Sequence, residues 1–142
     1  MPLAPLPQDP WSATLAALGQ VRAAWPSRGW SWDGRLQCVT SSFVVELETK
    51  ARAAAGIAMR NEWVATTIAS APPAIREIAD RTGGLRAGQI LLATSAGAGD
   101  FAFGLWWPWG DGMTTSLRIG LGGFRATDGA QQKLRDAFGV EL

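Results

Sequence analysis

The amino-acid sequence predicts an α+β fold, in which a central antiparallel sheet of about five or six strands is flanked by three helices. Apolar residues alternate with period two in several consecutive segments, and short glycine-rich turns join these segments. Helical patterns occur near the beginning, the middle and the end of the chain, and not between every two strands. Because a parallel sheet requires regular strand–helix alternation, this order favours an antiparallel sheet with helices on one face.

The chain is predicted to begin with a flexible proline-rich arm, residues 1–8, followed by a single α+β domain over residues 9–142. The first helix of this domain is expected to begin at Asp9, because aspartate is a good N-cap and Pro10 suits the first helical position. Apolar residues at helical spacing continue to Trp25, and the proline after it ends the helix.

Two further helices are predicted in the second half of the chain. One is expected over residues 71–84, where a proline pair opens the helix and a glycine pair closes it. The other is expected over residues 127–139, where Thr127 or Asp128 can act as the N-cap and a glycine ends the helix.

The region between the first two helices is predicted to be extended. A strand is expected to start at Arg35, and the charged residues between Phe43 and Arg52 all fall at even positions, which is the period of a strand. Residues 51–59 fit two descriptions, because the alternation continues there while the alanines favour a helix. We prefer a second strand or an extended connection for them, followed by another strand over residues 63–69.

The most distinctive feature of the chain is a tryptophan-rich hairpin over residues 101–121. A short apolar strand, residues 89–94, precedes it. Apolar alternation from Phe101 leads into a turn whose strongest signal is the pair Asp111-Gly112, and a second strand returns from there. This hairpin is expected to contribute to the core of the sheet.

Composition limits the kinds of partner. The chain has 142 residues and a net charge of +1, so it lacks the electrostatic footprint of a protein that binds nucleic acid or an anionic membrane. Its N-terminus does not have the pattern of a secretory signal peptide, and we expect a cytoplasmic protein. Eleven of the thirteen basic residues are arginine, which together with abundant alanine and glycine indicates a GC-rich bacterial genome.

Few side chains suited to catalysis are present. The chain has no histidine, the usual general base and metal ligand, and its one cysteine, Cys38, is expected to be a small buried apolar residue. Serine-hydrolase motifs are absent, and the glycine-rich loop before the hairpin lacks the helix that must follow a phosphate loop. Glu46 and Glu48 are interpreted as a solvated strand face, and Asp100 and Asp111 as turn residues. The sequence therefore predicts no metal and no cofactor, and it favours a non-catalytic role.

Tryptophan is the sharpest functional signal, because the chain has eight tryptophans and no tyrosine. Three of them cluster at the hairpin and two in one loop. Tryptophan rings dominate binding hot spots and stack on sugars and proline-rich peptides, but they also fill cores, and both interpretations stay open here. The candidate binding residues are tryptophans of these clusters and the charged residues nearest to them: Trp30, Trp32, Arg35, Trp107, Trp109, Asp111 and Arg118.

The leading functional expectation is a non-catalytic bacterial protein-binding module, such as an immunity-type toxin neutraliser or a secretion-associated chaperone or adaptor. A protein partner is expected, and self-association into a homo-oligomer is possible. One alternative is a small-ligand or carbohydrate-binding domain that uses tryptophan stacking, and another is an enzyme that relies on carboxylates only. A binding module should expose a flat apolar patch with tryptophan, a ligand binder a concave pocket walled by tryptophan, and an enzyme two carboxylates at one pocket.

Overall fold

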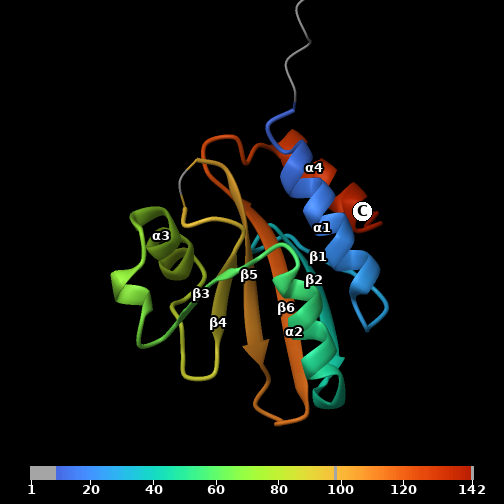
Figure 1. Cartoon of the computed structure of the whole chain (residues 1–142), viewed down its shortest axis with the longest axis vertical. Coiled ribbons are helices and arrows are strands. Elements are labelled where there is room, and N and C mark those ends of the chain that lie inside the picture. The colour runs from blue at the N-terminus through green and yellow to red at the C-terminus, as the bar shows by residue number, and fades with distance from the viewer. Residues whose placement is uncertain (1–8, 98, 142) are drawn as a thin grey trace, which may run out of the picture.

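The computed structural model describes residues 9–97 and 99–141, so the predicted arm over residues 1–8 lies outside the described residues. The described chain forms four α-helices, six strands and two short 3-10 turns (Figure 1). In chain order these are α1 (Ser12–Ala24), β1 (Ser31–Asp33), β2 (Cys38–Val44), η1 (Val45–Leu47), α2 (Glu48–Gly56), β3 (Asn61–Val64), η2 (Ile68–Ser70), α3 (Pro73–Arg81), β4 (Ile90–Ala93), β5 (Phe101–Pro108), β6 (Thr114–Gly122) and α4 (Asp128–Ala137).

All six strands belong to one antiparallel sheet with the order β1-β2-β6-β5-β4-β3. The predicted α+β class with a central antiparallel sheet is therefore confirmed. The tryptophan-rich hairpin, β5 with β6, occupies the middle of the sheet. Its register places Trp106 opposite Leu117 and Leu105 opposite Arg118.

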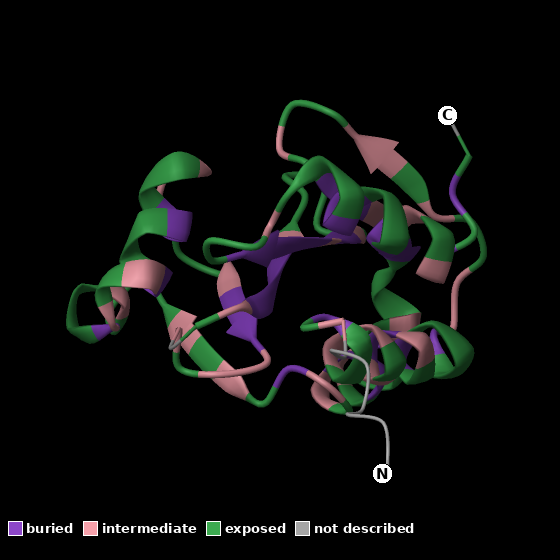
Figure 2. Ribbon diagram, turned by 90° about the horizontal axis from the view of Figure 1, so that it is seen from above, coloured by how far each residue is buried: buried purple, intermediate pink, exposed green. Residues whose placement is uncertain are grey.

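Helices cover both faces of the sheet, whereas the sequence predicted helices on one face (Figure 2). The first core lies between the sheet and α1, α2 and α4, and the second core lies between the sheet and α3. Helices are needed on both faces because the first six residues of β5 are all buried. Phe101 and Phe103 pack in the second core, while Trp106 packs in the first. A central strand that is apolar on both sides must be covered on both sides.

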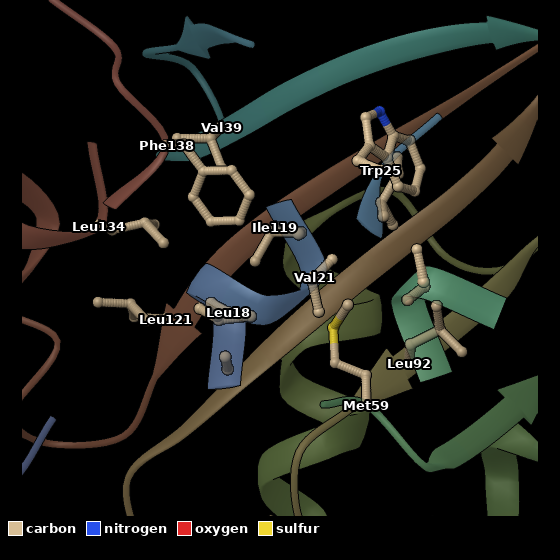
Figure 3. Packing of buried hydrophobic residues seen from close by; sticks show 14 of the residues in the cluster. Leu18, Val21, Trp25, Val39, Met59, Leu92, Ile119, Leu121, Leu134 and Phe138 are labelled. Carbon is tan, nitrogen blue, oxygen red and sulfur yellow. The ribbon is translucent and has the colours of Figure 1, made fainter. Parts of the chain in front are cut away.

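The first core is closed by α1. Figure 3 shows Leu18 and Val21 of α1 directed toward Ile119 of β6 and Met59, and all four side chains are fully buried. Trp25 ends the helix, and its indole nitrogen donates a hydrogen bond to the buried Ser41 hydroxyl at 3.0 Å. A buried indole usually needs such a partner, so this bond fixes the end of α1 on β2.

The predicted continuation of the strand through residues 46–52, and the preference for an extended segment over residues 51–59, are wrong. Strand β2 ends at Val44, and α2 follows from Glu48 to Gly56. This helix is additional to the three that the sequence predicted. Its buried residues, Ala51, Ala54 and Ala55, have helical spacing and are small enough for the helix to lie close to its neighbours. The high helix propensity of alanine, glutamate and lysine prevailed over the even spacing of the charges.

The strand predicted over residues 63–69 is shorter than expected, because β3 ends at Val64. The Thr67 hydroxyl accepts a hydrogen bond from the backbone N–H of Val64 at 2.9 Å, and the chain turns there into η2. Threonine offers the backbone this local partner in place of a neighbouring strand.

The boundaries of the predicted helices agree with the structure to within a few residues, whereas β1 lies in the loop that was predicted around Trp32. Helix α3 begins at the predicted proline pair, and the N–H of Gly84 donates to the carbonyl of Ala79 at 2.7 Å to close it. Thr127 caps α4 by accepting from the N–H of Ala130. Helix α1 begins three residues after Asp9, whose carboxylate accepts from the N–H of Trp11 at 2.9 Å.

Two phenylalanine rings lie over glycines of the neighbouring strand in the second core. Phe103 is paired with Gly120 and Phe101 with Gly122. A Cβ atom added at Gly120 would lie 2.6 Å from the Phe103 ring and 2.9 Å from the sulfur of Cys38, which is fully buried as predicted. The absence of a side chain on these glycines lets the rings lie flat on β6.

We predict that Gly120→Ala lowers the free energy of unfolding by about 1–3 kcal/mol, the usual cost of overpacking a core. Gly110→Ala serves as the matched control, because a Cβ atom at Gly110 meets nothing within 4 Å. Urea denaturation of both variants, followed by tryptophan fluorescence, gives the comparison. Equal losses in the two variants would contradict the packing explanation.

Candidate functional site

Exposed apolar side chains gather at the end of the sheet where β5 turns into β6. Val44, Val45, Trp109 and Met113 are 50%, 41%, 50% and 63% exposed. The N–H of Val45 donates to the carbonyl of Met113 at 2.8 Å, so the β2–α2 connection and the hairpin lie against each other at the lower end of Figure 1. These four residues are called the hairpin patch.

The turn that carries the hairpin patch is held by Asp111. One carboxylate oxygen accepts from the N–H groups of Met113 at 2.8 Å and Thr114 at 3.0 Å, and the other accepts from the Thr114 hydroxyl at 3.0 Å. The hydrogen bond from Met113 and those from Thr114 together lower the pKa of Asp111. The next residue, Gly112, has φ +68°, a conformation that favours glycine. Asp111 therefore fixes the turn and is not free to bind through both oxygens.

Arg118, in the middle of β6, joins three strands on the α3 side of the sheet. Its Nε atom lies 3.2 Å from a carboxylate oxygen of Asp33 in β1, and one of its terminal nitrogens donates to the Ser116 hydroxyl at 2.7 Å. Its guanidinium lies over the Trp107 ring, 4.7 Å from the centroid. The Asp33 and Arg118 side chains are only 17% and 21% exposed. Both charges are therefore satisfied within the fold.

Trp30 and Trp32 lie on the opposite face of the sheet from Trp107. Trp30 packs between Trp25 and Phe138, at ring distances of 5.1 and 4.5 Å. Trp32 lies under the Arg135 guanidinium, 4.6 Å from the ring centroid. Both are half-buried at the edge of the first core. They do not form one surface with the hairpin tryptophans.

The structure thus brings some of the predicted residues together and separates others. Trp107, Trp109 and Asp111 share the hairpin, with Arg118 next to Trp107, while Arg35 is exposed in the loop at the opposite end of β2. The sequence prediction did not select the other members of the hairpin patch. Two features of the sequence could have identified them. Consecutive valines at positions 44 and 45 break the strand alternation, and a methionine directly follows the turn glycine.

The carboxylates discussed from the sequence do not meet at one pocket. Asp100 precedes β5 and binds Arg125 at 3.7 Å, whereas Asp111 lies beyond the other end of that strand. Glu46 and Glu48 are exposed on η1 and at the start of α2. Within the described part of the chain, no three acidic or thiol side chains form a group that could hold a metal ion.

Comparison of the chain with protein-family models, with curated proteins and with solved structures found no match. None of the helices formed by residues 9–97 and 99–141 combines the length and apolar character needed to cross a lipid bilayer.

The Asp33–Arg118 ion pair generates a prediction for the pH dependence of stability. Burial alone would raise the pKa of Asp33, but the N–H of Leu36 and the Arg118 guanidinium outweigh it, so the pKa lies below its ordinary value. A carboxylate with a lowered folded-state pKa contributes stability above its unfolded-state pKa of about 4. This contribution is lost as the pH falls through the lower, folded-state value.

We therefore expect the protein to be more stable than its Asp33→Asn variant at neutral pH and to lose this advantage in acid. Urea unfolding at a series of pH values measures the difference directly. Asp80→Asn, which removes an exposed carboxylate on α3, controls for the change in net charge. A difference between the protein and Asp33→Asn that stays constant down to the acid limit would show that the pair does not supply this stability.

Proposed function

We propose that the protein is a non-catalytic binding module that holds a protein partner through the hairpin patch. The observation that carries this proposal is the exposure of Trp109 and Met113 beside two exposed valines at one end of the sheet. A cluster of large apolar side chains that is exposed to solvent on a folded domain often marks an interaction surface. Tryptophan and methionine are also enriched at the centres of protein interfaces.

The rigidity of the hairpin patch supports this role. Both strands behind it are central in the sheet, and the Asp111 carboxylate holds three donors of the turn. A surface that is already ordered loses little conformational entropy when a partner binds. Only two side-chain torsions of Trp109 have to be fixed when a partner binds.

The charges around the hairpin patch indicate the chemistry of the partner. Glu46, which directly follows Val45, and Asp111 are both exposed. Acidic groups at the rim favour association with a surface that carries lysine or arginine around an apolar centre. The proposed partner is therefore a protein with an apolar patch bordered by basic side chains.

The edges of the sheet do not favour binding by strand addition. Edge strand β1 has three residues and edge strand β3 has four, and Glu62 of β3 is exposed. Short, charged edges are the usual protection against pairing with another chain. The proposed contact therefore uses side chains of the hairpin and not the backbone of an edge.

Immunity-type toxin neutralisation and secretion-associated chaperone or adaptor work are two finer forms of this proposal. The alternatives have less support. Two neighbouring pockets at the far end of the sheet have no tryptophan in their walls, which does not favour a stacking site for sugars. Glu77 is the one carboxylate in those walls, so a pair for acid–base chemistry is not found there.

A double variant, Trp109→Ser with Met113→Ser, tests the proposal. We expect a photo-crosslinking residue placed at position 113 to capture a specific protein in a lysate of the native host. The purified partner should then bind the double variant about thirtyfold more weakly, since losing a central aromatic anchor costs about 2 kcal/mol. Titration calorimetry measures both affinities.

Glu46→Lys should slow association and weaken its salt dependence.

Phe124→Ser is the matched control, because Phe124 is fully exposed at the opposite end of the sheet. This variant should bind the partner as the unchanged protein does. If the double variant is folded and keeps full affinity, the hairpin patch is not the binding site. If the captured protein is a second copy of this chain, sedimentation at rising concentration will show a dimer that the double variant does not form.

A further inference from the structure

A pocket of about 430 Å³ lies at the end of the sheet opposite to the hairpin patch. It opens between α3, the loop that leads into β5 and the segment that follows β6. Figure 1 shows where these three segments lie in the fold. Its apolar wall is formed by Ile78, Phe101 and Leu121, and the fully exposed Phe124 stands at its rim. Its size is within the range of small-molecule sites.

A smaller pocket of about 160 Å³ continues the first one. The two share Arg81, Leu121 and Ala126, and the smaller one is completed by the loop of Arg35 and by Gln131 of α4. Together they form one groove with an apolar end and a polar end. This combined space is called the α3 groove.

The polar end contains a hydrogen-bonding group without a partner. Gln131 is 8% exposed, and its buried side-chain oxygen has no hydrogen-bond partner among the described residues. Buried polar atoms are nearly always paired, because an unpaired one has lost its bonds to water without replacement. Because Gln131 also lines the smaller pocket, we take its side-chain amide as the hydrogen-bonding group that a ligand in this pocket would meet.

The same end carries two positive charges. Arg35 and Arg81 both line the smaller pocket, and neither forms an ion pair within the described part of the chain. Arg118, by contrast, is held by Asp33. Guanidinium groups bind carboxylates with two parallel hydrogen bonds, and two of them disfavour an ammonium group beside the carboxylate. Glu77 lines the larger pocket, whereas the residues that line the smaller one include both arginines and no acid, so the donor for Gln131 should be uncharged.

We propose that the α3 groove binds a small organic acid that has a carboxylate, an uncharged hydrogen-bond donor next to it and an apolar body. The carboxylate lies against Arg35 and Arg81, the donor reaches the Gln131 oxygen, and the apolar body fills the larger pocket beside Phe101. An N-acylated hydrophobic amino acid has this chemistry. It occurs both as a free acid and as the C-terminal residue of a peptide.

N-acetyl-L-phenylalanine is the probe for this proposal. Titration calorimetry should show saturable binding of the acid. Its amide, which lacks the negative charge, and 3-phenylpropionate, which lacks the N–H donor, should each bind at least tenfold more weakly. N-acetyl-Gly-Gly-Phe distinguishes the two sources, because a peptide ligand predicts tighter binding of the tripeptide and a free acid predicts tighter binding of the single residue.

Three variants assign the contacts. Arg81→Gln should weaken binding of the acid at least tenfold, and Arg35→Gln, in an exposed loop, provides the same test if the first variant fails to fold. Gln131→Leu should bind the acid and 3-phenylpropionate equally. Arg76→Gln is the matched control, because Arg76 lies on α3 but does not line the groove, and its affinity should be unchanged.

The proposal is overturned if the acid does not bind at millimolar concentration, if the acid and its amide bind equally, or if Arg76→Gln has the same effect as Arg81→Gln. The Trp109→Ser, Met113→Ser double variant should keep full affinity for the acid. Failure of the groove and failure of the hairpin patch can therefore be recognised separately.

Discussion

The burial of β5 on both of its faces is the constraint on which the rest of the structure depends. Six consecutive residues, Phe101–Trp106, are removed from solvent, and a strand of this kind is stable only between two layers. The layers are α1, α2 and α4 on one side and α3 on the other. The two most exposed large apolar side chains of the described chain, Met113 and Phe124, lie beyond opposite ends of the hairpin. The same constraint that builds the core also separates the two candidate sites.

The two ends of the sheet differ in the ion pairs of their charged groups. Each end also has a buried polar atom without a partner among the described residues, the Trp107 indole nitrogen near the hairpin patch and the Gln131 oxygen at the groove. At the hairpin patch, the Asp111 carboxylate accepts three hydrogen bonds from its own turn, and in the middle of β6 Arg118 is paired with Asp33. Charges satisfied in this way fix geometry and are less available to another molecule. At the other end, the Gln131 oxygen has no partner among the described residues, and Arg81 is without an ion pair there. The lower end thus offers an apolar surface on a rigid support, and the upper end offers unpaired polar groups around a hollow.

The parts of the fold that the sequence predicts are those decided by local chemistry. A proline pair, a glycine pair, a threonine cap and an Asp-Gly turn each specify a boundary from a few neighbouring residues, and the structure has boundaries there. Helix α2 was missed because its buried face consists only of Ala51, Ala54 and Ala55, which give little hydrophobic contrast. The charged residues from 46 to 52 fall at every second position, and this spacing led to the prediction of a strand. Trp109 was selected from the tryptophan content of the sequence. The groove was not predicted, because it joins Arg81 to Gln131, which are fifty positions apart and are connected by no local pattern.

The two candidate sites are connected by β6, which runs from Thr114 beside the hairpin patch to Gly122 in the wall of the groove. The structure has one packing of this strand, which lies between two close-packed layers. Coupling between two ligands requires two states that each ligand binds differently. The residues of the hairpin patch and those of the groove do not overlap, so we expect a ligand in the groove to leave affinity at the patch unchanged. The two proposed ligands are therefore expected to bind at the same time and independently of each other.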